Sequence, residues 1–203
     1  MHQLPPIIWH KETDSTNSEA RRQLSSVDNL SVIAALNQTA GRGQGDHTWS
    51  SLPGENLTFS VVLKFDRGVL LARDALLITQ VTTRALRRLL ASKGIDSRIK
   101  WPNDIYVADM KKICGILIEN VLTSESVTAS IIGIGLDVNQ TVFSPDLPNP
   151  VSMKILTGIT YDIRALLDEF QTEMSNALDL IMTDEGRAAL DREFQSAVFY
   201  IDR

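Results

Sequence analysis

The 203-residue sequence predicts an α+β domain with a mixed, largely antiparallel sheet flanked by helices. Strand-like segments dominate the middle of the chain, and few helical patterns lie between them. A doubly wound parallel sheet would alternate strands and helices regularly, which this sequence does not do. Hydrophobic residues make up 43% of the chain, enough for a substantial core, so we expect residues 1–203 to form a single domain.

The first third of the chain contains three strand patterns, one helix pattern and one long loop. In chain order these are a strand at 7–10, a helix at 17–24, a strand at 31–36, a loop at 37–53 and a strand at 56–64. Asp14, Ser15 or Thr16 can cap the helix, because a side-chain oxygen there can accept from its first free amides. The last strand alternates apolar residues on one face, namely Leu57, Phe59, Val61 and Leu63.

A long helix is predicted at 70–93. Its buried stripe recurs at three- and four-residue spacing and comprises Ile78, Val81, Ala85 and Leu89. Gly94 suits the helix end. Strands follow at 97–100, 105–107, 113–120 and 127–138, and one or two helices at 162–182 and 184–194. Residues 199–203 are largely apolar and look like the start of another element.

Composition excludes several classes of function. The net charge of −5 argues against a general electrostatic grip on nucleic acid. Residues 1–9 lack the pattern of a signal peptide, and no stretch approaches the roughly 20 apolar residues of a membrane span, so we expect a cytoplasmic protein. Cys114 is the single cysteine and lies in an apolar run, which predicts a core residue.

Two polar segments in the first quarter stand out. The run Thr13–Asn17 offers five successive hydrogen-bonding side chains where a helix cap needs one or two, so it also suits a small polar ligand. The run Gln38–Gly45 is closed by Trp49, and its glycines allow a backbone to approach a ligand closely. Arg42 in this loop can clamp a phosphate or carboxylate. Plain capping and a surface loop remain the alternatives.

Three further segments lie between residues 100 and 139. Lys100–Asp104 places Asn103 and Asp104 at a strand end, where they can reach a ligand or a bound magnesium ion, although such turns are common. Lys112 lies at the edge of an apolar strand, where a cation can neutralise the charge that develops in acyl-phosphate chemistry. The strand end at 133–139 adds two glycines and two polar residues.

In this order, the segments resemble the catalytic domain of the biotin protein ligases, which belong to the biotin/lipoate ligase superfamily. The matching pieces are Asp14-Ser15-Thr16-Asn17, Gln38-x-Ala40-Gly41-Arg42-Gly43, Trp49, Lys100-Trp101-Pro102-Asn103-Asp104, Lys112-x-x-Gly115-Ile116-Leu117-x-Glu119 and Gly133-x-Gly135-x-x-Val138-Asn139. They span residues 13–139, about two-thirds of the chain. The resemblance implies a catalytic fold similar to that of class II aminoacyl-tRNA synthetases.

The resemblance also implies an ATP-dependent ligase that biotinylates a protein. Biotin and ATP, with Mg²⁺, would form biotinyl-5'-AMP and diphosphate. A specific lysine of a biotin carboxyl carrier protein would then accept the biotin and release AMP. No covalent enzyme intermediate is needed, so the protein contributes positioning and charge stabilisation.

The family's functional residues carry over by position. The resemblance makes Lys112 and Arg42 the catalytic candidates. The biotin contacts it implies are Ser15, Thr16, Asn17, Gln38, Gly41, Arg42, Gly43, Gln44, Lys112 and Gly115. Those on the nucleotide side are Arg42, Trp49, Asn103, Asp104, Asp137 and Asn139. We expect no metal site built by protein alone, and Mg²⁺ would arrive with ATP, with Asp104 as its candidate ligand.

The chain departs from the family's pattern at several positions. The glycine loop often carries further arginines where this chain has Gln44, Gly45 and His47, which predicts weaker retention of the adenylate or a rearranged phosphate grip. Asp137 stands where asparagine is common and adds a negative charge. We expect no N-terminal DNA-binding helix-turn-helix, and an absent or truncated C-terminal β-barrel.

Two other functions stay open at this point. A lipoate or octanoate ligase or transferase could use the same fold, although Cys114 inside an apolar strand is a poor catalytic thiol. A non-enzymatic small-molecule binder would leave Lys112 and Arg42 without a purpose. The resemblance predicts neither a nucleic-acid nor a membrane partner, and a homodimer remains one of the possible states.

Overall fold

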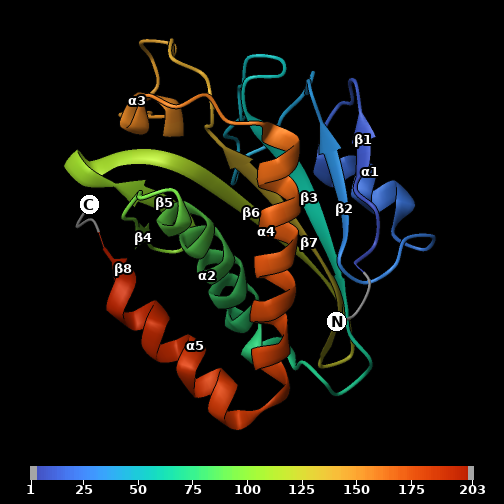
Figure 1. The fold of residues 1–203 in the computed structure, drawn as a ribbon. Coiled ribbons are helices and arrows are strands. Elements are labelled where there is room, and N and C mark those ends of the chain that lie inside the picture. The colour runs from blue at the N-terminus through green and yellow to red at the C-terminus, as the bar shows by residue number, and fades with distance from the viewer. Residues whose placement is uncertain (1–3, 201–203) are drawn as a thin grey trace. The chain divides into compact units, whose positions relative to one another are not determined.

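A computed structural model describes residues 4–200 and confirms the α+β class (Figure 1). Its strands are hydrogen-bonded neighbours in the order β1-β2-β3-β7-β6-β5-β4-β8. The pairs β2–β3, β4–β5 and β5–β6 are antiparallel, while β1–β2 and β4–β8 are parallel, so the sheet is mixed as expected. None of the described helices is long and apolar enough to cross a membrane.

The chain divides into two compact units. The first unit runs to Leu76 and includes Ile116–Gly135, and the second comprises Leu77–Gly115 and the chain from Leu136 onward. Two long strands, β6 (Lys111–Thr123) and β7 (Ser126–Leu136), contribute residues to both units.

The first unit holds the N-terminal strands and one helix. Its elements are β1 (Ile8–His10), α1 (Thr16–Gln23), β2 (Ser31–Ala35), β3 (Leu57–Lys64), the 3-10 turn η1 (Ala72–Asp74) and most of β6 and β7. Each of the predicted strands at 7–10, 31–36 and 56–64 is present within one or two residues of its expected bounds. Ser15 precedes α1 in extended conformation, at the position expected for the cap, but its side chain makes no capping hydrogen bond, so the predicted side-chain cap is absent.

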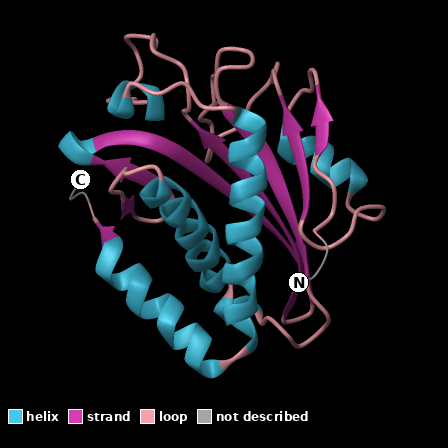
Figure 2. Ribbon diagram, viewed as in Figure 1, coloured by secondary structure: helices cyan, strands magenta, loops and turns pink. Residues whose placement is uncertain are grey.

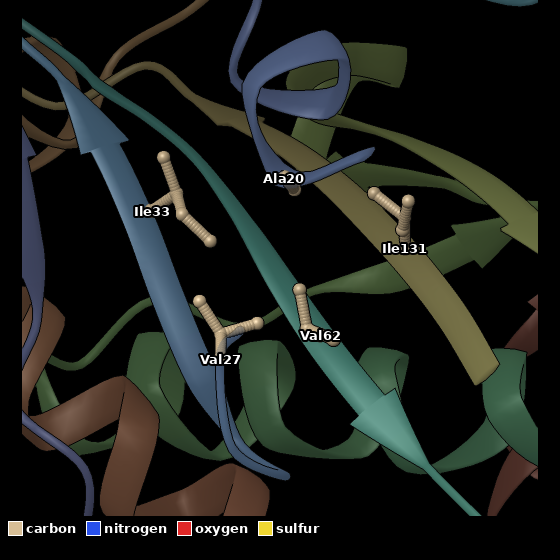
Figure 3. Packing of buried hydrophobic residues seen from close by; sticks show 5 residues of the cluster. All are labelled: Ala20, Val27, Ile33, Val62 and Ile131. Atoms are coloured by element: carbon tan, nitrogen blue, oxygen red, sulfur yellow. The ribbon is translucent and has the colours of Figure 1, made fainter. Parts of the chain in front are cut away.

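The core of the first unit lies between α1 and the sheet. Ala20 of α1, Ile33 of β2, Val62 of β3 and Ile131 of β7 are fully buried and pack together with Val27 (Figure 3). Burial on β3 extends to both faces, because Ser60 and Val62 are as inaccessible as Phe59 and Val61. The predicted apolar alternation therefore identified one buried face, while α1 covers the other.

The second unit holds most of the helices (Figure 2). Its elements are α2 (Leu76–Ser92, from Leu77 on), β4 (Arg98–Lys100), β5 (Asp104–Val107), η2 (Ala108–Met110), α3 (Met153–Thr157), α4 (Ile163–Leu178), η3 (Asp179–Met182), α5 (Asp184–Ala197) and β8 (Val198–Phe199), with the start of β6. The predicted stripe of α2 is buried throughout, with Ile78, Val81 and Ala85 at 0% exposure. Gly94 follows with φ of 76°, the left-handed conformation that ends a helix.

The predicted helix at 70–93 starts later than expected. The backbone of residues 70–72 instead bonds the start of β7: Ala72 N–H donates to Glu125 at 2.7 Å, and Val127 N–H donates to Leu70 at 2.9 Å. These bonds hold residues 70–72 in a bridge, so the α-helix begins only at Leu76. Local periodicity could not reveal this tertiary competition.

Two elements at the C-terminal side extend the prediction. The short helix α3 was not predicted; Ser152 Oγ caps it by accepting from Ile155 N–H at 3.2 Å, and Gly158 closes it at φ 75°. Of the apolar run at 199–203, Phe199 is the last residue of β8, which pairs with β4. Residues 201–203 lie outside the described part of the chain.

Candidate active site

The polar residues singled out by the sequence fall into two clusters, one in each unit. The first is built on the start of α1, where Ser15, Thr16 and Asn17 are all at most 3% exposed. Ser60 on the neighbouring strand β3 lies 2.6 Å from Asn17 Oδ1 and 2.8 Å from Thr16 Oγ1. Buried groups of this kind need hydrogen-bond partners, and here they supply one another. The result is a rigid set of neutral donors and acceptors.

Gln38 joins this cluster from the loop after β2. Its Oε1 accepts from Thr16 N–H at 2.8 Å, which satisfies one of the free amides at the start of α1. Backbone bonds brace the same junction: Thr39 N–H donates to Thr13 at 2.9 Å, and Ala40 N–H to Asp14 at 2.8 Å. The structure thus brings Ser15, Thr16, Asn17 and Gln38 together at the start of α1.

The glycine loop is a small hairpin. Trp49 N–H donates to Gly41 O at 3.0 Å, Gly43 N–H donates to His47 O at 2.8 Å, and Arg42 bridges to Thr48. A Cβ at Gly41 would overlap the backbone oxygen of Trp49, so only glycine allows this closure. Gln44 lies exposed at the turn, and the side chain of Arg42, 48% exposed, extends from the loop toward Glu119 on β6.

Two glycines on β7 make room for the first cluster. A Cβ at Gly133 would overlap the side-chain amide of Asn17, and a Cβ at Gly135 would overlap the indole ring of Trp49. Both positions therefore require glycine for close approach rather than for an unusual φ. They explain why glycines recur in the motif at 133–139.

The second cluster surrounds Lys112. Its Nζ lies 2.8 Å from Asp104 Oδ1, and the two side chains are 31% and 24% exposed. The backbone of Lys112 is held on both sides: its N–H donates to Asn149 O at 2.8 Å, and its carbonyl accepts from Val151 N–H at 3.0 Å. This cation therefore occupies a fixed position at the start of β6, as the sequence predicted.

Asp137 lies at the end of β7 in the same unit and is 5% exposed. Its amide donates to Ile113 O at 2.9 Å. Burial raises the pKa of its carboxyl to about 8, and the positive charge of Lys112 opposes that rise. Cys114 is fully buried nearby, and desolvation raises the pKa of its thiol well above the ordinary value. It is therefore the core residue that the sequence predicted.

The other candidate site residues of the second unit make different kinds of contact. Asn139 binds both backbone groups of Tyr161, donating to its oxygen and accepting from its N–H at 2.9 Å each, so it fastens the segment before α4. Gly115 accepts from Cys114 Sγ at 3.7 Å. Asn103 is half-buried in the turn before Asp104. Among the described residues, no group of three or more His, Cys, Asp or Glu side chains could hold a metal ion.

Sequence reasoning assigned no role to three residues of the first cluster, which are Ser60, Glu119 and Arg21. Glu119 Oε2 accepts from Asn17 Nδ2 at 2.9 Å, and its carboxylate also pairs with Arg42 and Arg21. The available signals were a serine on a strand with no exposed face and a glutamate ending an apolar run. Each is weak without knowledge of which strands are neighbours.

The arrangement suits a ligand with a neutral polar part and an anionic part. The buried hydroxyls and amides of the first cluster can bind uncharged polar groups, while Arg42 at its edge can bind an anion. Lys112 is a separate cation of the second unit, where it pairs with Asp104. Neither cluster presents an accessible nucleophile of the cysteine type, because Cys114 is buried.

Comparisons with known proteins match the chain to one family. The model of the biotin/lipoate A/B protein ligase family matches residues 9–137. The bifunctional ligase/repressor BirA of Bacillus spizizenii is 36% identical over 144 residues, covering 70% of this chain and 43% of that protein. BirA of Escherichia coli is 31% identical over 195 residues, covering 94% of this chain and 58% of that protein. The chain thus spans about half the length of these curated relatives.

Solved structures give the same picture. A biotin protein ligase from Aquifex aeolicus in complex with biotin and ATP superimposes with a TM-score of 0.80 at 25% identity, covering 98% of this chain and 80% of that one. The biotin protein ligase from Leishmania major in complex with biotin gives a TM-score of 0.78 at 25% identity, covering 96% and 82%.

Proposed function

Because the chain belongs to the biotin/lipoate A/B protein ligase family, we propose that it is a biotin protein ligase. It would join biotin to ATP to form biotinyl-5'-AMP and then pass biotin to a lysine of a biotin carboxyl carrier protein. The observation that carries the proposal is the buried, hydrogen-bonded set of Thr16, Asn17 and Ser60. A cation lies beside this set, because Glu119 binds both Asn17 and Arg42. A neutral polar head group and a carboxylate in one molecule match this pattern.

In the first step, an oxygen of the biotin carboxylate attacks the α-phosphorus of ATP, and the bond to diphosphate breaks. Negative charge gathers on the phosphoryl oxygens in the transition state, so a fixed cation accelerates the step. Lys112 is our candidate for this role because its backbone is hydrogen-bonded on both sides. Arg42, from the exposed hairpin, is our candidate for holding the carboxylate and later the phosphate of the adenylate.

In the second step, the amine of the carrier lysine attacks the acyl carbon, and AMP leaves with the bonding electrons. Water would compete for the same anhydride, so the site must shield it. The hairpin at 41–49 is the element we propose for this shielding, with Gln38, Gly41, Gly43 and Gln44 along the substrate and Trp49 on the nucleotide side. Ser15, Thr16 and Asn17 would bind the biotin head group, and Gly115 would lie along the ligand.

Magnesium would enter with the nucleotide. Asp104 would supply one carboxylate, which fits an ion that takes most of its ligands from water and phosphate oxygens. Bound there, Mg²⁺ would neutralise phosphate charge.

Asn103 and Asp137 remain candidates for the nucleotide side, while Asn139 would act indirectly through Tyr161. We keep the cytoplasm as the proposed compartment because the reaction consumes ATP, and leave a homodimer open.

One experiment tests the proposal directly. The protein is incubated with biotin, MgATP and a biotin carboxyl carrier domain, and the carrier mass is measured. We expect the mass to rise by one biotin on a single lysine, and not to rise when ATP is omitted. Lipoate in place of biotin is the matched control for the related activity. Modification by lipoate but not by biotin would replace this proposal with the lipoate alternative.

A further inference from the structure

Glu119 connects the first cluster, at the start of α1, to the glycine loop. Its Oε2 accepts from the buried Asn17 Nδ2 at 2.9 Å. The same carboxylate meets Arg42 through two longer contacts, NH1 to Oε2 at 3.4 Å and NH2 to Oε1 at 3.3 Å. Arg21 from α1 adds a third partner, with NH2 at 3.4 Å from Oε1. One carboxylate therefore holds one amide tightly and two arginines loosely.

The tight contact sets the direction of the hydrogen bonds in the cluster. A carboxylate only accepts, so Glu119 requires the nitrogen of the Asn17 amide to face it and leaves Oδ1 facing Ser60. Ser60 must then donate its single hydroxyl hydrogen to Asn17 Oδ1. In its contact with Thr16, the Thr16 hydroxyl must therefore be the donor. Glu119 thereby fixes which atoms of Thr16, Asn17 and Ser60 a ligand meets as donors or acceptors.

The loose contacts leave Arg42 available. Arg42 and Arg21 side chains are about half exposed, and ion pairs of this kind contribute little because water and salt screen them. Short charge-assisted bonds from a guanidinium to a bound carboxylate or phosphate are considerably stronger. When Arg42 turns to such an anion, Arg21 can remain on Glu119, so the carboxylate is not left without a cation.

We infer that Glu119 is a positioning residue that holds Arg42 beside the Asn17 cluster until an anionic substrate takes it, with Arg21 as the cation that stays behind. This inference rests on the proposed function for the identity of the substrate, but the retention of Arg42 by Glu119 is a property of the free protein. Glu119 and Arg21 touch no reacting atom and act through Asn17 and Arg42.

Two substitutions with opposite expected effects test this role. Glu119→Gln keeps an oxygen for Asn17 but removes the charge that retains Arg42. We expect amide exchange of residues 41–49 in the free protein to rise about threefold or more, and the KM for biotin to fall about threefold with little change in kcat. Arg21→Gln leaves Arg42 as the only arginine on Glu119. We expect slower exchange in the same segment and a KM about twofold to threefold higher.

Glu169→Gln is the matched control. Glu169 forms an exposed ion pair with Lys93, and both residues belong to the second unit, whereas Glu119 belongs to the first. This substitution should change neither quantity. If Glu119→Gln and Arg21→Gln shift exchange in the same direction, or if neither shifts it, the inference is wrong. A wild-type protein that fails to bind biotin would refute the proposed function instead, and the exchange comparison of the free proteins would still decide the role of Glu119.

Discussion

The ammonium of Lys112 lies 2.8 Å from Oδ1 of Asp104, so two side chains from separate sequence motifs form one ion pair. Asp104 begins β5 and Lys112 lies near the start of β6, and these strands are antiparallel neighbours in which Tyr106 pairs with Lys112. A register irregularity between Ile105 and Tyr106 accompanies this approach. The pair fixes both the position of the cation and the charge around it.

Lys112→Ala should slow formation of the adenylate by about 10²-fold or more, a few kcal/mol of transition-state stabilisation. Lys111→Ala is the matched control and should change the rate by less than about threefold, because a partly solvated charge acts through a high dielectric. Single-turnover adenylation, on variants first checked for folding, measures both. If Lys111→Ala lost most of its adenylation rate while Lys112→Ala kept it, the catalytic lysine would be Lys111.

Asp104→Asn should reduce the adenylation rate by about tenfold, because Lys112 loses the carboxylate that orients it. The same change in a Lys112→Ala background should have a smaller effect, since residues that act through one contact are not additive. Rates of the four proteins form a double-mutant cycle. Equal effects of Asp104→Asn in both backgrounds would mean that Asp104 acts independently of Lys112, for example on the metal-bound nucleotide.

The sequence predicted parts of both clusters. The apolar run after Lys112 predicts a strand with this lysine at its edge, and Lys112 does lie near the start of β6. The contacts of Glu119 could not be predicted in the same way, because Asn17 lies 102 residues away and Arg42 77 residues away along the chain. Which of the buried strands are neighbours is a tertiary property that alternation does not encode.

Similar limits apply to the fold. The stripe of α2 was visible because three- and four-residue spacing is a local signal, but its start was set by bonds from residues 70–72 to β7. The short helix α3 has five residues, too few for a periodic signal, and its formation depends on the caps Ser152 and Gly158. These features depend on partners that are far away in sequence or on single capping residues.

Gly135→Ala should displace Trp49, because a Cβ there would overlap the indole ring. We expect overpacking to destabilise the protein by about 1–3 kcal/mol and to weaken the protection of the nucleotide side. Chemical unfolding and tryptophan fluorescence report the two effects. In a Trp49→Ala background the alanine at 135 should be tolerated, and a cost that persists there would show that another neighbour causes it.

Asp137→Asn should change how stability depends on pH. Burial raises the pKa of Asp137 from 3.8 to about 8, so between these values the folded protein holds a proton that the unfolded chain releases. The favourable contribution of this carboxyl is therefore complete below pH 4 and is lost as the pH rises through 8. Asparagine does not titrate, so the variant does not lose this stability as the pH rises.

We expect the stability of Asp137→Asn relative to wild type to increase between pH 5 and pH 8, by up to about 1.4 kcal/mol for each pH unit, and to level off above pH 8. Urea unfolding at pH 5, 7 and 9 measures the difference. Asp168→Asn, on the exposed face of α4, is the matched control and should follow the wild-type profile. Parallel profiles for wild type and Asp137→Asn would show that Asp137 is ionised in the folded protein at neutral pH, with Lys112 outweighing the cost of burial.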